Sequence, residues 1–180
     1  HHDYRLLRDL ISRHDQRLAI VEIGSYAGRS AFAMLEMLKA VGNETTKIYC
    51  YDPYQAGTEA ESAGSRPITE ARDCFRTAIE ACGEGRIILY ELDATVGAQR
   101  YDGPKVGLLH DDGDHTYVQV RAELEAWLPY LAPNCAIVFD DWLSYRGIRA
   151  ACWDVLDPAD WTIMGRGYSR FLVRQILVSQ

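Results

Sequence analysis

The feature that most constrains the fold of this chain is the alternation of short apolar runs with longer amphipathic segments. Continuous apolar runs rich in β-branched residues suit strands that are buried on both faces of a parallel sheet. Helical periodicity between such runs favours right-handed β–α–β crossovers. The expected strands are Leu18–Ile23, Lys47–Tyr51, Arg86–Leu92, Val106–His110 and Cys135–Phe139, and the expected helices are Tyr4–His14, Ser30–Val41, Thr69–Cys82, Tyr117–Leu131 and Gly147–Leu156.

Beyond the fifth apolar run the pattern changes. Trp161–Met164 and Ser169–Val178 flank the glycine-rich segment Gly165–Gly167 and are expected to form a hairpin. We therefore expect an α/β fold with a doubly wound, mostly parallel, seven-stranded Rossmann-like sheet that has an antiparallel terminal strand. The length suits a single domain over residues 1–180. Pro53–Pro67 is a long segment without periodicity, for which a substrate lid and a surface loop are both open.

The charge balance limits the partners of the chain. Lys and Arg number 19 against 26 Asp and Glu, which gives a net charge of −7. Such a chain is poorly suited to bind phosphate backbones or anionic lipid, so neither nucleic acid nor membrane is expected. The five cysteines are odd in number and form no C-x-x-C pair, which favours reduced thiols and a cytoplasmic protein. A small molecule is the expected partner, and the terminal strand offers an edge for a homodimer.

A glycine-containing turn after the first strand is the strongest local signal. Gly24 permits a tight turn and close approach of a ligand, and Gly28 precedes a helix whose first N–H groups suit a polar or anionic ligand group. Asp52 ends the second strand, where an acid can accept hydrogen bonds from ribose hydroxyls. The G-x-x-x-G spacing departs from the G-x-G-x-x-G of dinucleotide-binding proteins. A simpler interpretation makes the glycines turn residues and Asp52 a helix cap.

The segment Glu22–Ser30 (EIGSYAGRS) resembles the E-x-G-x-Y-x-G-x-S motif of the catechol and caffeoyl-CoA O-methyltransferase group. These are class I S-adenosylmethionine-dependent methyltransferases, and related bacterial enzymes are of the methyltransferase family 24 type. The resemblance covers roughly Ile20–Trp142 and implies S-adenosylmethionine as the cofactor, with Asp52 at its ribose and Asp93–Ala94 beside its adenine. It assigns cofactor binding to Glu22, Gly24, Ser25, Tyr26, Gly28, Ser30, Asp52, Asp93, Ala94 and Asp112.

Acidic residues follow the fourth and fifth strands, in His110–His115 (HDDGDH) and at Asp140 and Asp141. The carboxyl ends of parallel strands meet at one edge of a sheet, so these groups should lie near the glycine turn. Clustered carboxylates repel unless a cation or hydrogen-bond donors compensate, and their oxygens suit Mg²⁺. The alternative is that Asp141 caps the next segment and that Asp111 and Asp114 are solvated turn residues.

The same segments resemble the metal-dependent O-methyltransferases, which carry a D-x-x-[KH]-x-Y motif and a D-[DN] pair one strand later. This resemblance implies Mg²⁺ or another divalent cation, with Asp112, Asp140 and Asp141 as its ligands. The Asp140–Asp141 pair replaces the commoner Asp-Asn of the family. The chain also has only Asp3–Asp15 before its first strand, where the plant and mammalian enzymes have extra helices that help to form the substrate pocket.

His115 occupies the position of the family's general base. An imidazole near its ordinary pKa can accept a hydroxyl proton around neutral pH. The alternative is a helix N-terminal residue without a chemical role, and His110 is interpreted as structural.

These observations favour an S-adenosylmethionine-dependent methyltransferase that transfers a methyl group to a small-molecule hydroxyl with divalent-metal assistance. A phenol, a sugar hydroxyl and a small metabolite all stay open as the acceptor. Two alternative functions are also considered. One is a nicotinamide-dependent oxidoreductase on a Rossmann fold, which should carry the three-glycine fingerprint. The other is a methyltransferase-like domain that binds a ligand without catalysis.

Overall fold

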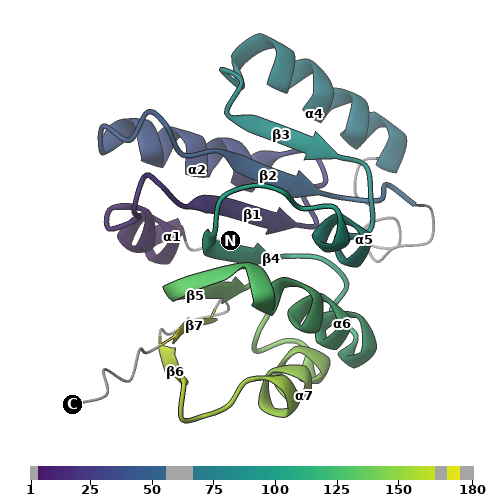
Figure 1. The fold of residues 1–180 in the computed structure, drawn as a ribbon. Helices are drawn as coiled ribbons and strands as arrows, with labels where there is room; N and C mark the ends of the chain where they lie inside the picture. The colour runs from purple at the N-terminus through teal and green to yellow at the C-terminus, as the bar shows by residue number, and fades with distance from the viewer. Residues whose placement is uncertain (1–3, 56–66, 165–169, 175–180) are drawn as a thin grey trace.

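Five parallel strands form the centre of the sheet in the computed structural model, which describes residues 4–55, 67–164 and 170–174. The strands of the sheet are β1 (Ala19–Ile23), β2 (Ile48–Tyr51), β3 (Ile87–Tyr90), β4 (Val106–Asp111), β5 (Leu131–Phe139), β6 (Trp161–Met164) and β7 (Arg170–Arg174). Strands β1 to β5 pair in parallel, and β7 pairs antiparallel with both β5 and β6. The strand order is β3-β2-β1-β4-β5-β7-β6 (Figure 1). The predicted α/β fold with a central parallel sheet is confirmed.

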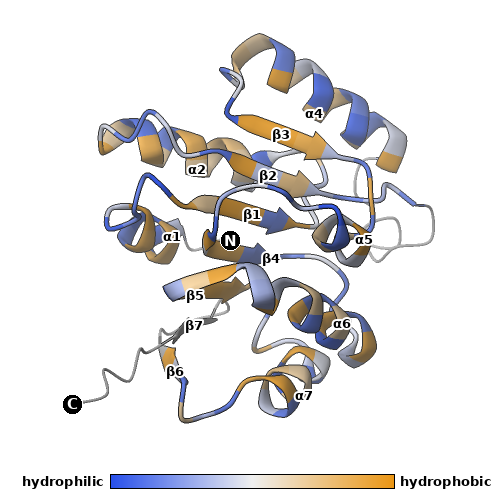
Figure 2. Ribbon diagram, viewed as in Figure 1, coloured by the Kyte–Doolittle hydropathy of each residue, from blue (hydrophilic) through white to orange (hydrophobic). Residues whose placement is uncertain are grey.

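Helices cover both faces of this sheet (Figure 1). They are α1 (Tyr4–Ile11), α2 (Arg29–Ala40), α4 (Ile68–Cys82), α5 (Ala94–Gln99), α6 (Tyr117–Trp127) and α7 (Arg146–Val155). Helices α1, α2 and α4 cover one face, which we call the α2 face, and α5, α6 and α7 cover the other, the α6 face. Successive strand side chains alternate between the faces, so Ile20 joins the core under α2 whereas Val21 joins the core under α6. Figure 2 shows strands that are mostly hydrophobic and helices that also carry hydrophilic residues.

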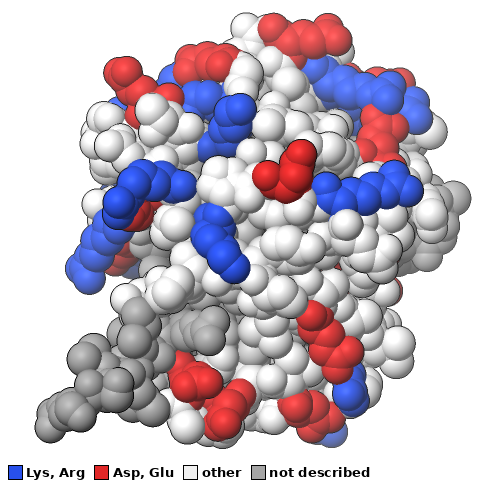
Figure 3. Space-filling model, viewed as in Figure 1, with Lys and Arg blue, Asp and Glu red and all other residues white. Residues whose placement is uncertain are grey.

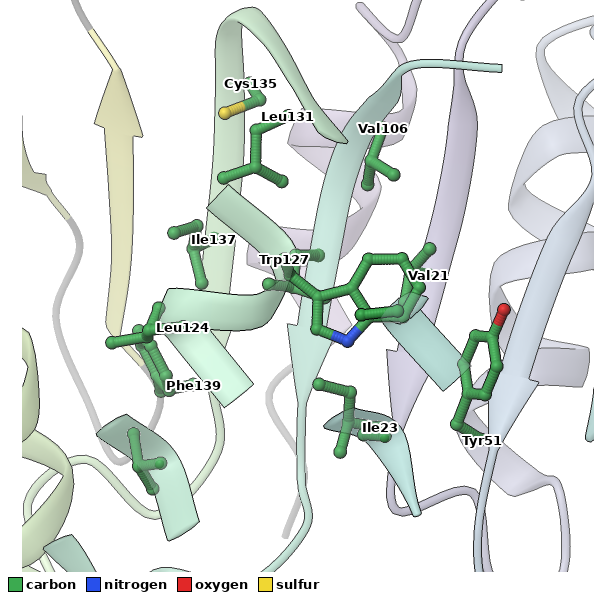
Figure 4. Packing of buried hydrophobic residues seen from close by; sticks show 14 of the residues in the cluster. Val21, Ile23, Tyr51, Val106, Leu124, Trp127, Leu131, Cys135, Ile137 and Phe139 are labelled. Carbon is green, nitrogen blue, oxygen red and sulfur yellow. The ribbon is translucent and has the colours of Figure 1, made fainter. Parts of the chain in front are cut away.

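Trp127 is the largest fully buried side chain on the α6 face (Figure 4). Its ring lies 5.2 Å from the ring of Tyr51 and 5.2 Å from that of Tyr101, both distances measured between centroids. Tyr51 in turn stacks on Tyr90 at 5.0 Å. This aromatic cluster joins α6 to the central strands, and it fixes the helix that follows the β4 turn.

Two boundaries differ from the sequence prediction. Helix α6 ends at Trp127, a 3-10 turn covers Leu128–Tyr130, and β5 begins at Leu131, so the predicted helix was too long and the predicted strand too short. Pro129 contributes to this difference, because proline has no N–H to continue the hydrogen bonds of the α-helix. Helix α5 was not predicted; it begins after Asp93, whose carboxylate accepts a hydrogen bond from the Thr95 N–H at 2.8 Å.

Part of the predicted organisation lies outside the described residues. This applies to most of the Pro53–Pro67 segment, to the Gly165–Gly167 turn and to both ends of the predicted Ser169–Val178 strand. Among the described residues, no helix is long and apolar enough to cross a membrane. On the face drawn in Figure 3, basic and acidic side chains are interspersed.

Candidate functional site

The turn after β1 and the turn after β4 touch at the carboxyl edge of the sheet. The N–H of Asp112 donates to the carbonyl of Ile23 at 3.0 Å, and the N–H of Gly24 donates to the carbonyl of Tyr51 at 2.9 Å. Gly24 has a φ of +77°, and a Cβ atom there would overlap the main-chain carbonyl of Asp112. The glycine that the sequence suggested for ligand approach is therefore already required by contact between the two turns.

Packing also requires a glycine at position 28, at the start of α2. Its φ is +79°, and a Cβ atom there would overlap the ring of Phe75, a fully buried residue of α4. Gly28 also precedes the first helical residue, and no side chain caps the first turn of α2, in which Ser30 lies. The N–H groups of an uncapped first turn suit an anionic ligand group.

Asp52 holds the glycine turn from the end of β2. Its carboxylate accepts hydrogen bonds from the N–H groups of Tyr26 at 2.7 Å and Tyr54 at 2.8 Å. The hydroxyl of Tyr54 donates to the carbonyl of Tyr26 at 2.7 Å, which closes the connection. Burial raises the pKa of Asp52, and the two backbone donors oppose that rise. Asp52 is thus a loop-binding carboxylate rather than the helix cap of the simpler interpretation.

Glu22 lies in a buried polar group on the α2 face. The register aligns Glu22 of β1 with Cys50 of β2 and with His110 of β4. Glu22 is fully buried; its Oε1 lies 3.2 Å from Nδ1 of His110, and its Oε2 accepts a hydrogen bond from the Cys50 thiol at 3.6 Å. Burial lowers the pKa of His110, but the hydrogen bond and charge of Glu22 outweigh it and raise that pKa to about 9. His110 is thus buried with Glu22 as its partner, which agrees with a structural role; a contact of Glu22 with cofactor stays a prediction.

The acidic residues at the end of β4 and directly after it separate onto the two faces of the sheet. Asp111 is buried on the α6 face, where burial raises its pKa to about 6 and burial together with Asp111 raises the pKa of Glu123 to about 9. Asp112 turns toward the other side, where burial raises the pKa of its carboxyl, His110 lowers it and Asp140 raises it again. Asp111 and Asp112, although adjacent in the chain, therefore face different sets of charged groups.

The predicted metal-ligand set is not assembled in the structure. The N–H of Asp141 donates to Oδ1 of Asp140 at 3.0 Å, while the Asp141 carboxylate accepts from the Ser144 hydroxyl at 3.4 Å. Asp141 has a φ of +51° and its carbonyl accepts from the Ser144 N–H, so it forms the turn that follows β5. Within the described residues, which include Asp112, no three His, Cys, Asp or Glu side chains are grouped closely enough to hold a metal ion. A metal site formed by Asp112, Asp140 and Asp141 is therefore not shown, and their role as ligands stays a prediction.

His115 follows the β4 turn and immediately precedes the N-cap of α6, Thr116. Its imidazole stacks on the ring of Tyr145, with centroids 4.4 Å apart and planes inclined by 17°. Tyr145 is the residue before α7, so the contact joins the β4–α6 and β5–α7 connections. Sequence reasoning did not identify this aromatic partner, because the two residues are separated by thirty positions in the chain. The role of His115 as a base stays a prediction.

Asp93 and Ala94 begin α5, and Asp93 connects this helix to α6. The amide of Gln119 donates to Asp93 at 3.2 Å and to Glu123 at 3.0 Å. Burial raises the pKa of Asp93, but hydrogen bonds from Thr95 and Gln119 outweigh it and leave the pKa below its usual range. Gln119 and Glu123 were not predicted, although their spacing of four residues places them on one face of a helix.

Comparison with known proteins identifies the family. Residues 21–142 match a family described as methyltransferase domain, so the chain belongs to that methyltransferase family. Uncharacterized protein y4gI of Sinorhizobium fredii is 29% identical over 126 residues, which cover 68% of this chain and 13% of that protein. The chain therefore spans only a small part of this relative.

Solved structures share the fold. CalS11, a TDP-rhamnose 3'-O-methyltransferase of calicheamicin biosynthesis, superposes with a TM-score of 0.67 at 22% identity, over 93% of this chain and 77% of that one. The Podospora anserina methyltransferase PaMTH1, solved with S-adenosylhomocysteine, has a TM-score of 0.67 at 18% identity, over 96% and 79% of the two chains. The predicted membership of a class I S-adenosylmethionine-dependent methyltransferase family is confirmed.

The contact between Gly28 and Phe75 predicts a large effect of a single methyl group. Gly28→Ala should lower the free energy of unfolding by about 3 kcal/mol, because overlap with a buried ring adds to the cost of a left-handed alanine. Gly42→Ala is the matched control, since Gly42 has a φ of +70° and open space around it; a loss of about 1 kcal/mol is expected. Urea denaturation measures both. Equal losses would contradict the steric explanation.

The buried pair of Glu22 and His110 predicts a displaced titration. The pKa of about 9 lies above the unfolded value of 6.5, so the charged pair stabilises the fold fully below about pH 6.5 and this contribution is lost as the pH rises through about 9. Glu22→Gln removes the charge that contributes most to raising the His110 pKa, so this pKa should fall by at least about one unit although Asp112 and Asp140 still raise it. Histidine NMR titration measures both values. Glu36→Gln, on the exposed side of α2, is the control, and an unchanged His110 pKa in Glu22→Gln would refute the pairing.

Proposed function

We propose that this domain transfers a methyl group from S-adenosylmethionine to a hydroxyl of a small molecule, with His115 as the general base. The observation that carries the proposal is the connection made by Asp52, which ties the glycine turn after β1 to the end of β2 at the carboxyl edge of the sheet. In a methyltransferase-family chain, this edge is where an open α/β sheet binds a nucleotide-like ligand.

The residues of this edge suit the separate parts of the cofactor. We assign the uncapped first turn of α2, with Ser30, to the methionine carboxylate, because its N–H groups carry partial positive charge. Asp52 has lone pairs beyond those that bind Tyr26 and Tyr54, and we assign them to the ribose hydroxyls. We assign the Asp93–Ala94 segment at the start of α5 to the adenine. The neighbour PaMTH1 was solved with S-adenosylhomocysteine, which supports the choice of ligand.

The proposed chemistry requires one proton transfer by this chain. When bound, the cofactor supplies an electrophilic methyl group on a sulfonium sulfur. His115 accepts the proton of the acceptor hydroxyl while the oxygen attacks the methyl carbon in line. Because the predicted carboxylate set is not grouped, we assign no step to a metal ion.

A sugar hydroxyl is the acceptor class that we favour among those left open by the sequence. CalS11 is described as acting on the 3'-hydroxyl of TDP-rhamnose, and it has the same fold over most of this chain. Family membership also favours methyl transfer over hydride transfer. A domain that binds the cofactor without catalysis differs only in the outcome of a transfer assay.

Asp52 provides the binding test. Titration calorimetry with S-adenosylhomocysteine should give saturable binding to the wild-type protein, and Asp52→Asn should raise Kd roughly tenfold or more, because a charged acceptor for two hydroxyls is lost. Asp102→Asn, at an exposed position before β4 and so at the opposite edge of the sheet, should bind as the wild type does. His115→Asn should keep the wild-type Kd but lose transfer of labelled methyl to nucleotide sugars and phenols. A folded protein that does not bind at millimolar ligand would refute the proposal.

A further inference from the structure

The turn after β5 carries Tyr145 back over the segment that follows β4. The N–H groups of Ser144 and Tyr145 both donate to the carbonyl of Asp141, at 2.8 and 3.1 Å, and the positive φ of Asp141 permits this tight turn. Tyr145 then stacks on His115 with nearly parallel rings. The main chain of Asp141 therefore directs an aromatic ring onto the imidazole, although its carboxylate was predicted to bind a metal.

The start of α7 is pressed against the backbone of the same segment. A Cβ atom on Gly147 would overlap the carbonyl of His115 and come within 2.6 Å of the Tyr117 nitrogen. The Arg149 guanidinium also donates to the carbonyl of Trp142, which ties α7 to the turn that leads into it. Tyr145 is thus held between a fixed turn and a closely packed helix start.

The backbone around His115 is fixed independently of Tyr145. The N–H of Thr116 donates to the Asp114 carboxylate at 2.7 Å, and the Thr116 hydroxyl accepts from the N–H of Gln119 at 3.4 Å as the cap of α6. These bonds set the main chain on the C-terminal side of His115, and they do not involve its imidazole.

We propose that Tyr145 is a positioning residue for His115: its ring fixes the orientation of the imidazole and its face stabilises the imidazolium that forms during transfer. This inference rests on the proposed function. The hydroxyl proton moves to a ring nitrogen of His115, the oxygen forms a bond to the methyl carbon, and the electron pair of the broken carbon–sulfur bond stays on sulfur. His115 ends as a cation, and a cation over an aromatic face is stabilised by the quadrupole of the ring. Asp111 of β4 is a second group within electrostatic reach of His115, and its charge acts in the same direction.

Substitutions at Tyr145 distinguish the effect of its aromatic ring from that of its hydroxyl group. Tyr145→Phe keeps the aromatic face and should keep kcat close to that of the wild type. Tyr145→Leu and Tyr145→Met remove the face and should lower kcat roughly three- to tenfold, with KM for S-adenosylmethionine unchanged. Trp153→Leu is the matched control, because Trp153 lies on α7 with 57% of its surface exposed, and its kcat should not change.

A spectroscopic measurement tests the positioning without reference to activity. In the wild type and in Tyr145→Phe, the ring protons of His115 should appear upfield in the NMR spectrum because they lie in the shielding region of a stacked ring. In Tyr145→Leu and Tyr145→Met they should move to ordinary positions. Unchanged His115 shifts in both non-aromatic variants would overturn the inference, and so would a loss of kcat in Tyr145→Phe as large as that in Tyr145→Leu.

An incorrect assignment of His115 as the base can be distinguished from an incorrect role for Tyr145. If His115→Asn keeps the wild-type kcat, His115 is not the base, and the ring shifts still decide whether Tyr145 positions it. If His115 is the base, Tyr145→Leu added to His115→Asn should lower kcat no further. An additional loss in the double variant would show that Tyr145 acts elsewhere and would also overturn the inference.

Discussion

The contact between the turn after β1 and the turn after β4 governs the arrangement of the candidate site. Parallel pairing of β1 with β4 aligns Ile23 with Asp111 and brings the next residues, Gly24 and Asp112, into main-chain contact. Only a residue without a side chain fits there. The same turn is held on its other side by Asp52, so three consecutive strands of the sheet, β2, β1 and β4, define one rigid edge. This packing places four of the predicted cofactor-binding residues, Gly24, Tyr26, Asp52 and Asp112, at one edge of the sheet.

Alternation of side chains across the sheet explains how this chain buries so many acidic groups. Neighbouring residues of a strand point to opposite faces, so Asp111 lies under α6 with Glu123, whereas Glu22 and His110 lie under α2. Each group has its own compensation. On the α2 face a histidine of raised pKa balances Glu22, and on the α6 face the raised pKa of Glu123 favours its neutral form beside Asp111.

The sequence supports the fold more fully than the site. The apolar runs that became β1 to β5 need only local pattern, because strands buried on both faces have few polar positions. Helix α5 is short and its only clear signal is the cap at Asp93, so periodicity could not reveal it. The sequence predicts Gly24 and Gly28 as turn glycines, yet the groups that require them, the Asp112 carbonyl and the Phe75 ring, come from distant segments. The predicted metal ligands are not grouped in the structure for a related reason: Asp141 closes a turn with Ser144, and this depends on backbone geometry rather than on residue type.

The proposed binding site for the methyl donor and the proposed base, His115, come from opposite faces of the sheet, and they can act together only at its edge. The glycine turn leads into α2, on one face, whereas His115 and Tyr145 precede α6 and α7, on the other. A hydroxyl that loses its proton to His115 and attacks a methyl group held by the β1 turn must therefore lie across the carboxyl ends of β1 and β4. Small changes in the direction of the imidazole would then alter the alignment of proton, oxygen and methyl carbon, and in-line transfer depends strongly on that alignment. An aromatic ring that fixes the imidazole is the kind of support that such a two-sided site requires.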